Sequence, residues 1–271
     1  MGTVAGLWRY PVKSAGGQGM THVDANQGGV VGDRKWAVVD DAGIIVSAKH
    51  PARGGRLLQV SCGYCDGSGE TRLRVPAGPE VVAGTAEADR AVSAWLSEPV
   101  HLSSDPVPGA ALRRWWPSQL DLVPEWQSSA LPGTAAVTSM AGPARHRSFV
   151  DYGALHLIFT DDLRRLGVAS CCDIDPIRFR PNILVEGGSE FRDASRIRIG
   201  DVILDVELPT PRCALPGVSP QNGTLDAAIL RALAKHDRRP VGSLGTAACF
   251  GLYARLSANA RFSVGDQVSA E

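Results

Sequence analysis

The sequence predicts a mainly β fold with a few helices (α+β), and three observations support this prediction. Short apolar runs of strand length alternate with breaker residues along the chain. The 30 glycines and 18 prolines are spread along the chain and are not gathered in one linker. Few segments show the 3- and 4-residue apolar spacing of a helix. Such punctuation is typical of β domains whose sheets curl or close.

The first half of the chain is expected to contain several strands bounded by turn residues. We predict them at Val4–Trp8, Trp36–Val39, Gly43–Val46, Leu57–Val60 and Arg72–Val75. One helix is expected to interrupt these strands, because apolar residues after Thr85 recur at helical spacing until Pro99 ends the pattern.

The second half repeats this mixture. Helices are expected at Asp161–Leu166 and Leu225–Lys235, where apolar residues follow a 3.6-residue period. Strands are expected at Leu155–Thr160, Asn182–Glu186, Arg196–Ile199, Val202–Leu208, Cys249–Leu256 and Arg261–Val268.

Charge and composition exclude several classes of protein. Lys plus Arg and Asp plus Glu both number 28, so the formal net charge is zero. No global field draws such a protein to nucleic acid or to an anionic membrane, and neither partner is expected. An anionic ligand must therefore be bound by a local cluster of cations. The start of the chain lacks the pattern of a signal peptide, and no apolar run is long enough to span a bilayer, so we expect a cytoplasmic protein.

The six cysteines are expected to be reduced, because a chain of 271 residues can build a full core without disulfides. Cys62 and Cys65 have the spacing of a redox pair or half a zinc site. No second such pair completes a zinc site, and no thioredoxin-like context surrounds them, so ordinary thiols are favoured. The histidines form no closely spaced pair, which argues against a histidine metal site.

One cysteine stands in a setting that suits chemistry. A predicted strand leads into the proline-rich turn Pro209–Pro216, where Arg212 directly precedes Cys213. Prolines restrict this turn, and a neighbouring guanidinium favours thiolate, which is both a soft metal ligand and a nucleophile. A buried cysteine that acts as a small apolar residue is the alternative, and the local sequence leaves both interpretations open.

Other segments offer groups that bind anions. Lys13 and Ser14 follow the first strand in a turn and could bind a phosphate. Arg34 and Arg180 each lie beside a strand in a Gly- or Pro-restricted setting, and Asn182 follows Arg180 closely. Taken singly, an exposed turn lysine and surface ion pairs are the commoner explanations of these residues.

In this order, these segments resemble the MOSC family, the molybdenum cofactor sulfurase C-terminal domains, including the amidoxime-reducing components and their bacterial relatives. The resemblance runs from the first strand to the last and is weakest over residues 60–150. It is carried by Arg9–Ser14, Gly32–Arg34 with Trp36, Asp151 with Leu155–Ile158, Arg178–Asn182, Ile199–Asp201, Pro211–Cys213, Gly251–Ala254 and Val264–Asp266.

The resemblance implies a MOSC N-terminal β-barrel domain over residues 1–105 and a MOSC β-barrel domain over 106–271, to whose pocket residues near the N-terminus contribute. It also implies a molybdenum cofactor (molybdopterin) held between them, with Cys213 as the metal ligand. The residues that would hold the pterin and its phosphate are Lys13, Ser14, Arg34, Arg180, Asn182 and Arg212. Asp151 is a candidate for proton delivery.

The family's chemistry implies an oxidoreductase that reduces small N-hydroxylated or N-oxide substrates. No ferredoxin cysteine pattern follows the barrel, so an external electron-donor protein would be needed. The loop after Cys213 departs from the amidoxime-reducing pattern at Pro216, Ser219-Pro220 and Asn222-Gly223, which leaves the substrate open. Two alternatives remain: a sulfur carrier with a persulfide on Cys213, and a barrel recruited to a biosynthetic ligand without molybdenum.

Overall fold

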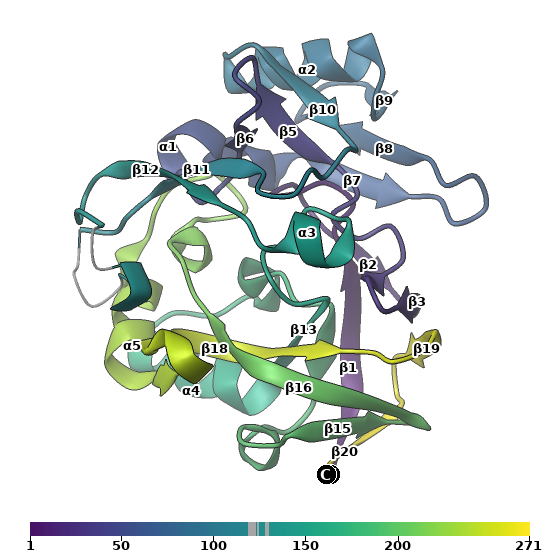
Figure 1. Cartoon of the computed structure of the whole chain (residues 1–271), viewed down its shortest axis with the longest axis vertical. Helices are drawn as coiled ribbons and strands as arrows, with labels where there is room; N and C mark the ends of the chain where they lie inside the picture. Colours follow the sequence, from purple (N-terminus) through teal and green to yellow (C-terminus); the bar gives the residue numbers. More distant parts are fainter. Residues whose placement is uncertain (119–122, 124, 128–129) are drawn as a thin grey trace.

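The computed structural model of the chain describes residues 1–118, 123, 125–127 and 130–271. In these ranges the fold is mostly β with five helices, as predicted. Seven strands close into a barrel, and smaller sheets form the N-terminal half beside it (Figure 1). No helix in the described ranges is long and apolar enough to cross a membrane.

The barrel joins the start of the chain to its second half. Its strands follow the order β13-β14-β1-β20-β15-β16-β18, and antiparallel pairing of β18 with β13 closes it. All neighbours are antiparallel except β13 and β14. Their bounds are Leu155–Phe159 (β13), Ile183–Val185 (β14), Gly2–Arg9 (β1), Gln267–Ala270 (β20), Arg196–Ile199 (β15), Val202–Pro211 (β16) and Thr246–Arg255 (β18). Two short strands extend this sheet, Gln18–Met20 (β2) beside β1 and Arg238–Pro240 (β17) beside β18.

Strand alternation explains why β13 is apolar along its whole length. Leu155, Leu157 and Phe159 pack inside the barrel, while Ile158 faces the helices outside. The outer layer consists of α4 (Thr160–Ser170) and α5 (Ala227–His236), which pack on each other and cover one side of the barrel (Figure 1). Because His156 takes an outward position on the same strand, the alternation directs a polar ring away from the core.

The N-terminal half is built on a five-stranded sheet of order β10-β5-β6-β11-β12. A three-stranded sheet, β7-β8-β9, and the helix α2 pack around a second core. The small sheet β19-β3-β4 packs instead on the core of the barrel. The first sheet contains Val100–Ser103 (β10), Ala37–Asp40 (β5), Ile45–Val46 (β6), Ala111–Trp115 (β11) and Ala135–Ser139 (β12). The remaining bounds are Ser61–Tyr64 (β7), Thr71–Arg74 (β8), Glu80–Val82 (β9), Ala260–Ser263 (β19), His22–Asn26 (β3), Gly29–Val30 (β4), Pro51–Gly54 (α1), Ala86–Leu96 (α2) and Gly142–His146 (α3).

The proposed boundary at residue 105 stays a prediction. Strands β11 and β12 follow it in sequence and pair within the N-terminal sheet, whereas β1 precedes it and lies in the barrel. The chain therefore crosses between the two halves more than once.

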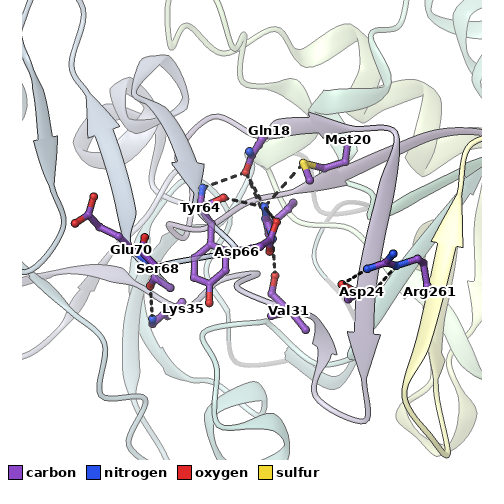
Figure 2. A network of polar contacts seen from close by, with 12 residues as sticks. Gln18, Met20, Asp24, Val31, Lys35, Tyr64, Asp66, Ser68, Glu70 and Arg261 are labelled. Carbon is purple, nitrogen blue, oxygen red and sulfur yellow. Dashed lines mark hydrogen bonds and ion pairs between the residues drawn. The ribbon is translucent and has the colours of Figure 1, made fainter.

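Arg9 ties β1 to the β7–β8 hairpin. Its guanidinium is buried and donates to Asp66 Oδ1 at 2.6 Å and to the Tyr64 carbonyl at 2.9 Å. It also donates to Gln18 Oε1 and to the Val31 carbonyl, and it lies 4.7 Å from the centre of the Tyr64 ring. Figure 2 shows these partners gathered from β2, β7 and the loop after β7.

Two predicted strands are wrong in detail. Leu57–Val60 does not form a strand, because Gly55–Gln59 forms the 3-10 helix η1. Leu57 and Val60, the residue that follows the helix, are three positions apart and both are buried, which suits the three-residue period of that helix. The predicted strand Arg261–Val268 is two strands, β19 and β20, since Gly265 turns the chain between them with a φ of 95°.

Candidate functional site

A cavity between the barrel and the N-terminal half brings the predicted site residues together. It encloses about 640 Å³, counted out to where it opens to solvent. Its lining includes every residue predicted for the site: Lys13, Ser14, Arg34, Asp151, Arg180, Asn182, Arg212 and Cys213. These residues come from the loop after β1, the turn before β5, the segment before β13, the 3-10 helix η4 (Pro176–Phe179) and the loop after β16.

Asp151 joins two lysines at one end of this cavity. The Nζ atoms of Lys13 and Lys49 donate to the same carboxylate oxygen of Asp151, at 2.8 Å and 2.7 Å. Lys13 also donates to the Phe149 carbonyl at 3.0 Å. Burial alone would raise the pKa of Asp151, but the ammonium of Lys13 and then that of Lys49 hold it well below its usual range. Desolvation dominates at Lys13 and lowers its pKa to about 8.

At the other end, one tyrosine ring contacts two arginines, of which Arg180 is buried and Arg34 half-buried. The guanidinium of Arg34 lies 4.5 Å from the centre of the Tyr10 ring, and that of Arg180 lies 4.2 Å from it. Arg34 is paired with Asp33 and donates to the Arg180 carbonyl at 2.9 Å. Among the described residues, the guanidinium of Arg180 donates to the backbone carbonyls of residues 12 and 15 alone. Burial, followed by the charge of Arg34, lowers the pKa of Arg180 to about 10.

The backbone is strained at three of these positions. Ser14, Arg34 and Arg180 have φ values of 65°, 44° and 54°, in the left-handed region that residues with a Cβ rarely adopt. They are three of the seven non-glycine residues with positive φ in the described part of the chain. Such strain persists only where the surroundings hold it, and it concentrates at functional sites.

His156 orients the arginine beside the cysteine. Its Nε2 lies 3.2 Å from Arg212 Nη2, and its Nδ1 lies 3.4 Å from the Arg180 carbonyl. Burial, reinforced by the charge of Arg212, holds the pKa of His156 well below its usual range. The ring is therefore neutral, with Nδ1 donating to the carbonyl and Nε2 accepting from Arg212. Arg212 also donates to the Phe179 carbonyl at 3.1 Å, while its buried Nε has no partner among the described residues.

Cys213 follows this arginine at the end of β16 and is a free, partly exposed thiol. The turn that holds it is fixed by the Arg212 N–H, which donates to the Ala248 carbonyl at 2.8 Å. The 3-10 helix η6 (Leu215–Gly217) then leads the chain away.

Two predicted residues are bound to the backbone. Asn182 Oδ1 accepts from the His156 N–H at 3.2 Å, and its Nδ2 donates to the Trp8 carbonyl at 3.3 Å, so Asn182 ties β1 to β13. Ser14 Oγ accepts from the Ala48 N–H at 3.0 Å. Their assignment to pterin binding stays a prediction.

The sequence did not single out Lys49, His156 or Tyr253 for the site, although all three line the cavity. His156 and Tyr253 lie in the segments that carry the family resemblance. Lys49 had no signal of its own, because its pairing with Asp151 joins residues 102 positions apart.

A second, larger cavity meets the first at the cysteine. It encloses about 1120 Å³, counted in the same way. The residues that line both cavities are Lys49, Asp151, Arg212, Cys213 and Tyr253. The thiol thus lies where the two spaces join.

Comparison with known proteins identifies the family. The MOSC domain matches residues 144–269, and the MOSC N-terminal beta barrel domain matches residues 1–101. The chain therefore belongs to the MOSC-domain proteins that carry this N-terminal barrel. This confirms the resemblance seen in the sequence and the predicted fold class.

Named relatives are distant. The chain is 24% identical to human molybdenum cofactor sulfurase over 98% of its own length, but it spans only 32% of that protein. It is also 24% identical to human mitochondrial amidoxime-reducing component 1, covering 99% of this chain and 82% of the relative. The YUAD protein from Bacillus subtilis is a solved structure that aligns with a TM-score of 0.45 and 12% identity, over 98% of this chain and 93% of that one.

The residues of the first cavity fit a pterin cofactor that carries a phosphate and binds a metal. Five cations line it: Lys13, Arg34, Lys49, Arg180 and Arg212. Against them stand the carboxylates of Asp151 and of Asp33, which pairs with Arg34. The cations are in excess, which suits an anionic group, and the unpartnered Nε of Arg212 is a free donor beside the thiol. The described residues contain no cluster of three or more His, Cys, Asp or Glu able to hold a metal ion.

Proposed function

We propose that this protein holds a molybdenum cofactor in the first cavity and reduces N-hydroxylated or N-oxide compounds, with electrons from an external partner protein. The observation that carries the proposal is the convergence of eight predicted residues on one cavity, with Cys213 at its junction with a second. The amidoxime-reducing and molybdenum cofactor sulfurase relatives support it.

Each residue has a task in this proposal. Cys213 supplies the thiolate that ligates the metal, and Lys13, Arg34, Arg180 and Arg212 balance the charge of the phosphate and the thiolate. Ser14 and Asn182 complete the wall that holds the pterin. When bound, the cofactor supplies the two-electron chemistry, and the protein supplies binding and orientation.

Removing one hydroxyl oxygen from nitrogen as water consumes two electrons and two protons. We infer that Lys13 is the better proton donor of the buried pair, since its pKa of about 8 lies near neutrality. The pKa of Asp151 is held well below its usual range, so its carboxylate stays ionised and orients the lysine. Lys49 holds the same oxygen from its other side. Asp151 therefore acts in proton delivery through Lys13.

The test begins with molybdenum content, measured by elemental analysis on protein made in a host that synthesises the cofactor. The wild type is expected to carry near-stoichiometric metal, and Cys213→Ala is expected to lose most of it. Cys249→Ala is the matched control, because this cysteine is buried and lies outside the lining of both cavities. Loaded wild type should then reduce an amidoxime with a chemical electron donor. Wild-type protein without molybdenum from such a host would refute the proposal.

A sulfur carrier is the second candidate. The observation that favours it is the partly exposed thiol of Cys213, which a sulfur acceptor could reach from the second cavity. Intact-mass measurement before and after treatment with thiol reductant would detect a persulfide. A reducible sulfur adduct that disappears in Cys213→Ala, on protein without molybdenum, would favour the carrier over the reductase.

A further inference from the structure

The second cavity has walls of its own, built from a part of the chain that the family comparisons leave unmatched. The two domain matches end at residue 101 and begin again at 144. Between these limits lie Arg114, Trp116 and Thr138, which line the second cavity and not the first. The wall that these three residues build is therefore separate from the wall of the first cavity.

Aromatic rings line this cavity. Trp116 is 4% exposed. Its backbone N–H donates to the Thr134 carbonyl at 2.9 Å, which holds its backbone in place. The rings of Tyr152 and Tyr253 lie 6.1 Å apart on the barrel side. Rings at such positions stack with planar ligands. A flat aromatic group therefore suits this space.

Arg114 is the cation of this wall that has no acidic partner. Its Nε donates to Thr138 Oγ1 at 2.8 Å, and its guanidinium lies 5.0 Å from the centre of the Trp116 ring. Among the described residues, no carboxylate pairs with it and no acceptor binds its two Nη atoms. The hydrogen bond of Nε to Thr138 and the contact with the Trp116 ring fix the guanidinium. Its two outer nitrogens can then bind a carboxylate with two parallel hydrogen bonds.

The other charged groups of the cavity are already engaged. Lys49 is paired with Asp151, the only carboxylate among the described lining residues. Arg212 is bound through Nη2 to the ring of His156 and to the Phe179 carbonyl, and its unpartnered Nε is buried. An anionic substituent would thus find a free partner at Arg114, while a cationic one would find none.

We propose that the second cavity selects planar aromatic N-hydroxylated substrates that carry a carboxylate. The carboxylate binds Arg114, the ring lies among Trp116, Tyr152 and Tyr253, and the N-hydroxyl end faces Cys213. This inference rests on the proposed reductase function for the identity of the reacting group. The selectivity for a carboxylated aromatic ring rests on the cavity alone.

The test compares benzamidoxime with 4-carboxybenzamidoxime, a pair that differs only in the carboxylate. Binding is measured by calorimetry on the full chain loaded with cofactor and by competition with steady-state reduction. The carboxylated compound is expected to bind about 10- to 100-fold more tightly, as for a hydrogen-bonded ion pair. Arg114→Gln should remove this preference.

Arg113→Gln is the matched control, because it removes the same charge from the neighbouring position of β11 without touching the cavity lining. Thr138→Val is a second variant that leaves the guanidinium in place but removes the acceptor of its Nε, and it should reduce the preference by a smaller factor. Circular dichroism and thermal unfolding establish that each variant folds.

The outcomes separate this inference from the proposed function. Reduction of both compounds with equal affinity, or a preference that survives Arg114→Gln, would overturn the substrate selectivity while leaving the reductase intact. Arg114-dependent binding of the carboxylated compound without any reduction would sustain the cavity assignment and refute the reductase. Loss of the preference in Arg113→Gln to the same extent would show a general charge effect and overturn the assignment.

Discussion

Asp151→Asn tests the most tightly coupled charges of the site. The carboxylate holds the ammonium groups of Lys13 and Lys49 on one oxygen, at 2.8 Å and 2.7 Å. The side chain of Lys13 is only 7% exposed, so its charge cannot turn to water when the carboxylate is removed. An amide keeps the shape of the side chain and removes the charge.

The expected loss follows from this geometry. Removing one partner of a fully buried ion pair costs about 3–5 kcal/mol. Two ammonium groups about 5 Å apart then repel by about 3 kcal/mol at an effective dielectric constant of about 20. The Asp151 side chain is 38% exposed because it faces the cavity, so solvent screens part of this effect. We expect the free energy of unfolding at neutral pH to fall by about 2–3 kcal/mol.

The loss should depend on pH in a defined direction. The pKa of Lys13 is lowered to about 8 from the usual 10.5, so the unfolded chain binds more protons between these values and stability rises with pH there. Without Asp151 the pKa of Lys13 falls further. The variant therefore begins to gain stability from deprotonation of Lys13 at a lower pH than the wild type does. The difference in free energy of unfolding between the wild type and Asp151→Asn is therefore largest near pH 6 and shrinks as the pH rises to about 9.

Urea unfolding of protein purified without cofactor, followed by tryptophan fluorescence from about pH 6 to about pH 9, measures both effects. Asp205→Asn is the control, since that carboxylate faces Arg196 and Arg255 at 3.8 Å and 3.6 Å on the surface. Its loss should stay below about 1 kcal/mol. A loss in Asp151→Asn no larger than in this control, or one that does not change with pH, would refute the reasoning.

Substitutions at three further positions test the supports of the site by urea unfolding. The buried hydroxyl of Tyr10 has no partner among the described residues, so Tyr10→Phe should raise the free energy of unfolding by up to about 1 kcal/mol. Tyr10→Leu also loses both cation–π contacts and should lower the free energy of unfolding by about 2–4 kcal/mol. A loss of stability in Tyr10→Phe would contradict this reasoning. Arg9→Gln should lower the free energy of unfolding by about 1–3 kcal/mol, because part-buried carbonyl acceptors lose their donor, and an unchanged midpoint would contradict this. In Gly153→Ala the added Cβ would lie 2.5 Å from the Tyr253 ring, so the free energy of unfolding should fall by about 1–3 kcal/mol. Calorimetry should also detect weaker binding of aromatic amidoximes by this variant. Gly63→Ala is the control, because its Cβ would meet open space, and it should change neither stability nor binding.

Local signals predicted much of the secondary structure. The helix α2 begins after Thr85, whose side chain accepts from the Ala88 N–H, and its end precedes Pro99, as the capping pattern indicated. The helix α5 begins after Asp226, which caps it in the same way. These features depend on a few neighbouring residues, so the sequence contains them directly.

The errors arise where tertiary contacts override local preference. The apolar residues Leu57 and Val60 suggested a strand, yet the glycines before them let the chain turn close to the Ser47 backbone, where an added Cβ at Gly54 would lie 2.3 Å from its carbonyl oxygen. A short run of apolar residues does not distinguish a strand from a 3-10 helix in which residues three positions apart pack on the same core.

The site could be predicted only as a set of chemical types. Lys13, Arg34 and Arg180 were individually consistent with surface ion pairs, and the resemblance to a family supplied their association. Their mutual arrangement, in which two guanidiniums contact the same Tyr10 ring, depends on tertiary packing that the sequence does not show. Lys49 was missed for the same reason, since its partner is fixed by the packing of the two halves.

The two cavities share Cys213 but are built from different sets of residues. In the proposed function, one set binds the cofactor and the other selects the substrate. The first cavity draws its cations from both halves of the chain and fixes three of its residues in left-handed backbone, so a change at one position disturbs the others. Arg114 and Trp116 stand instead on one strand and its end, joined to the rest of their wall by a side-chain contact with Thr138. Substitutions there can alter which ring and which charge reach Cys213 without moving the groups that hold the phosphate. Under the two proposals, selectivity depends on β11 and β12, and cofactor binding depends on cations from both halves of the chain.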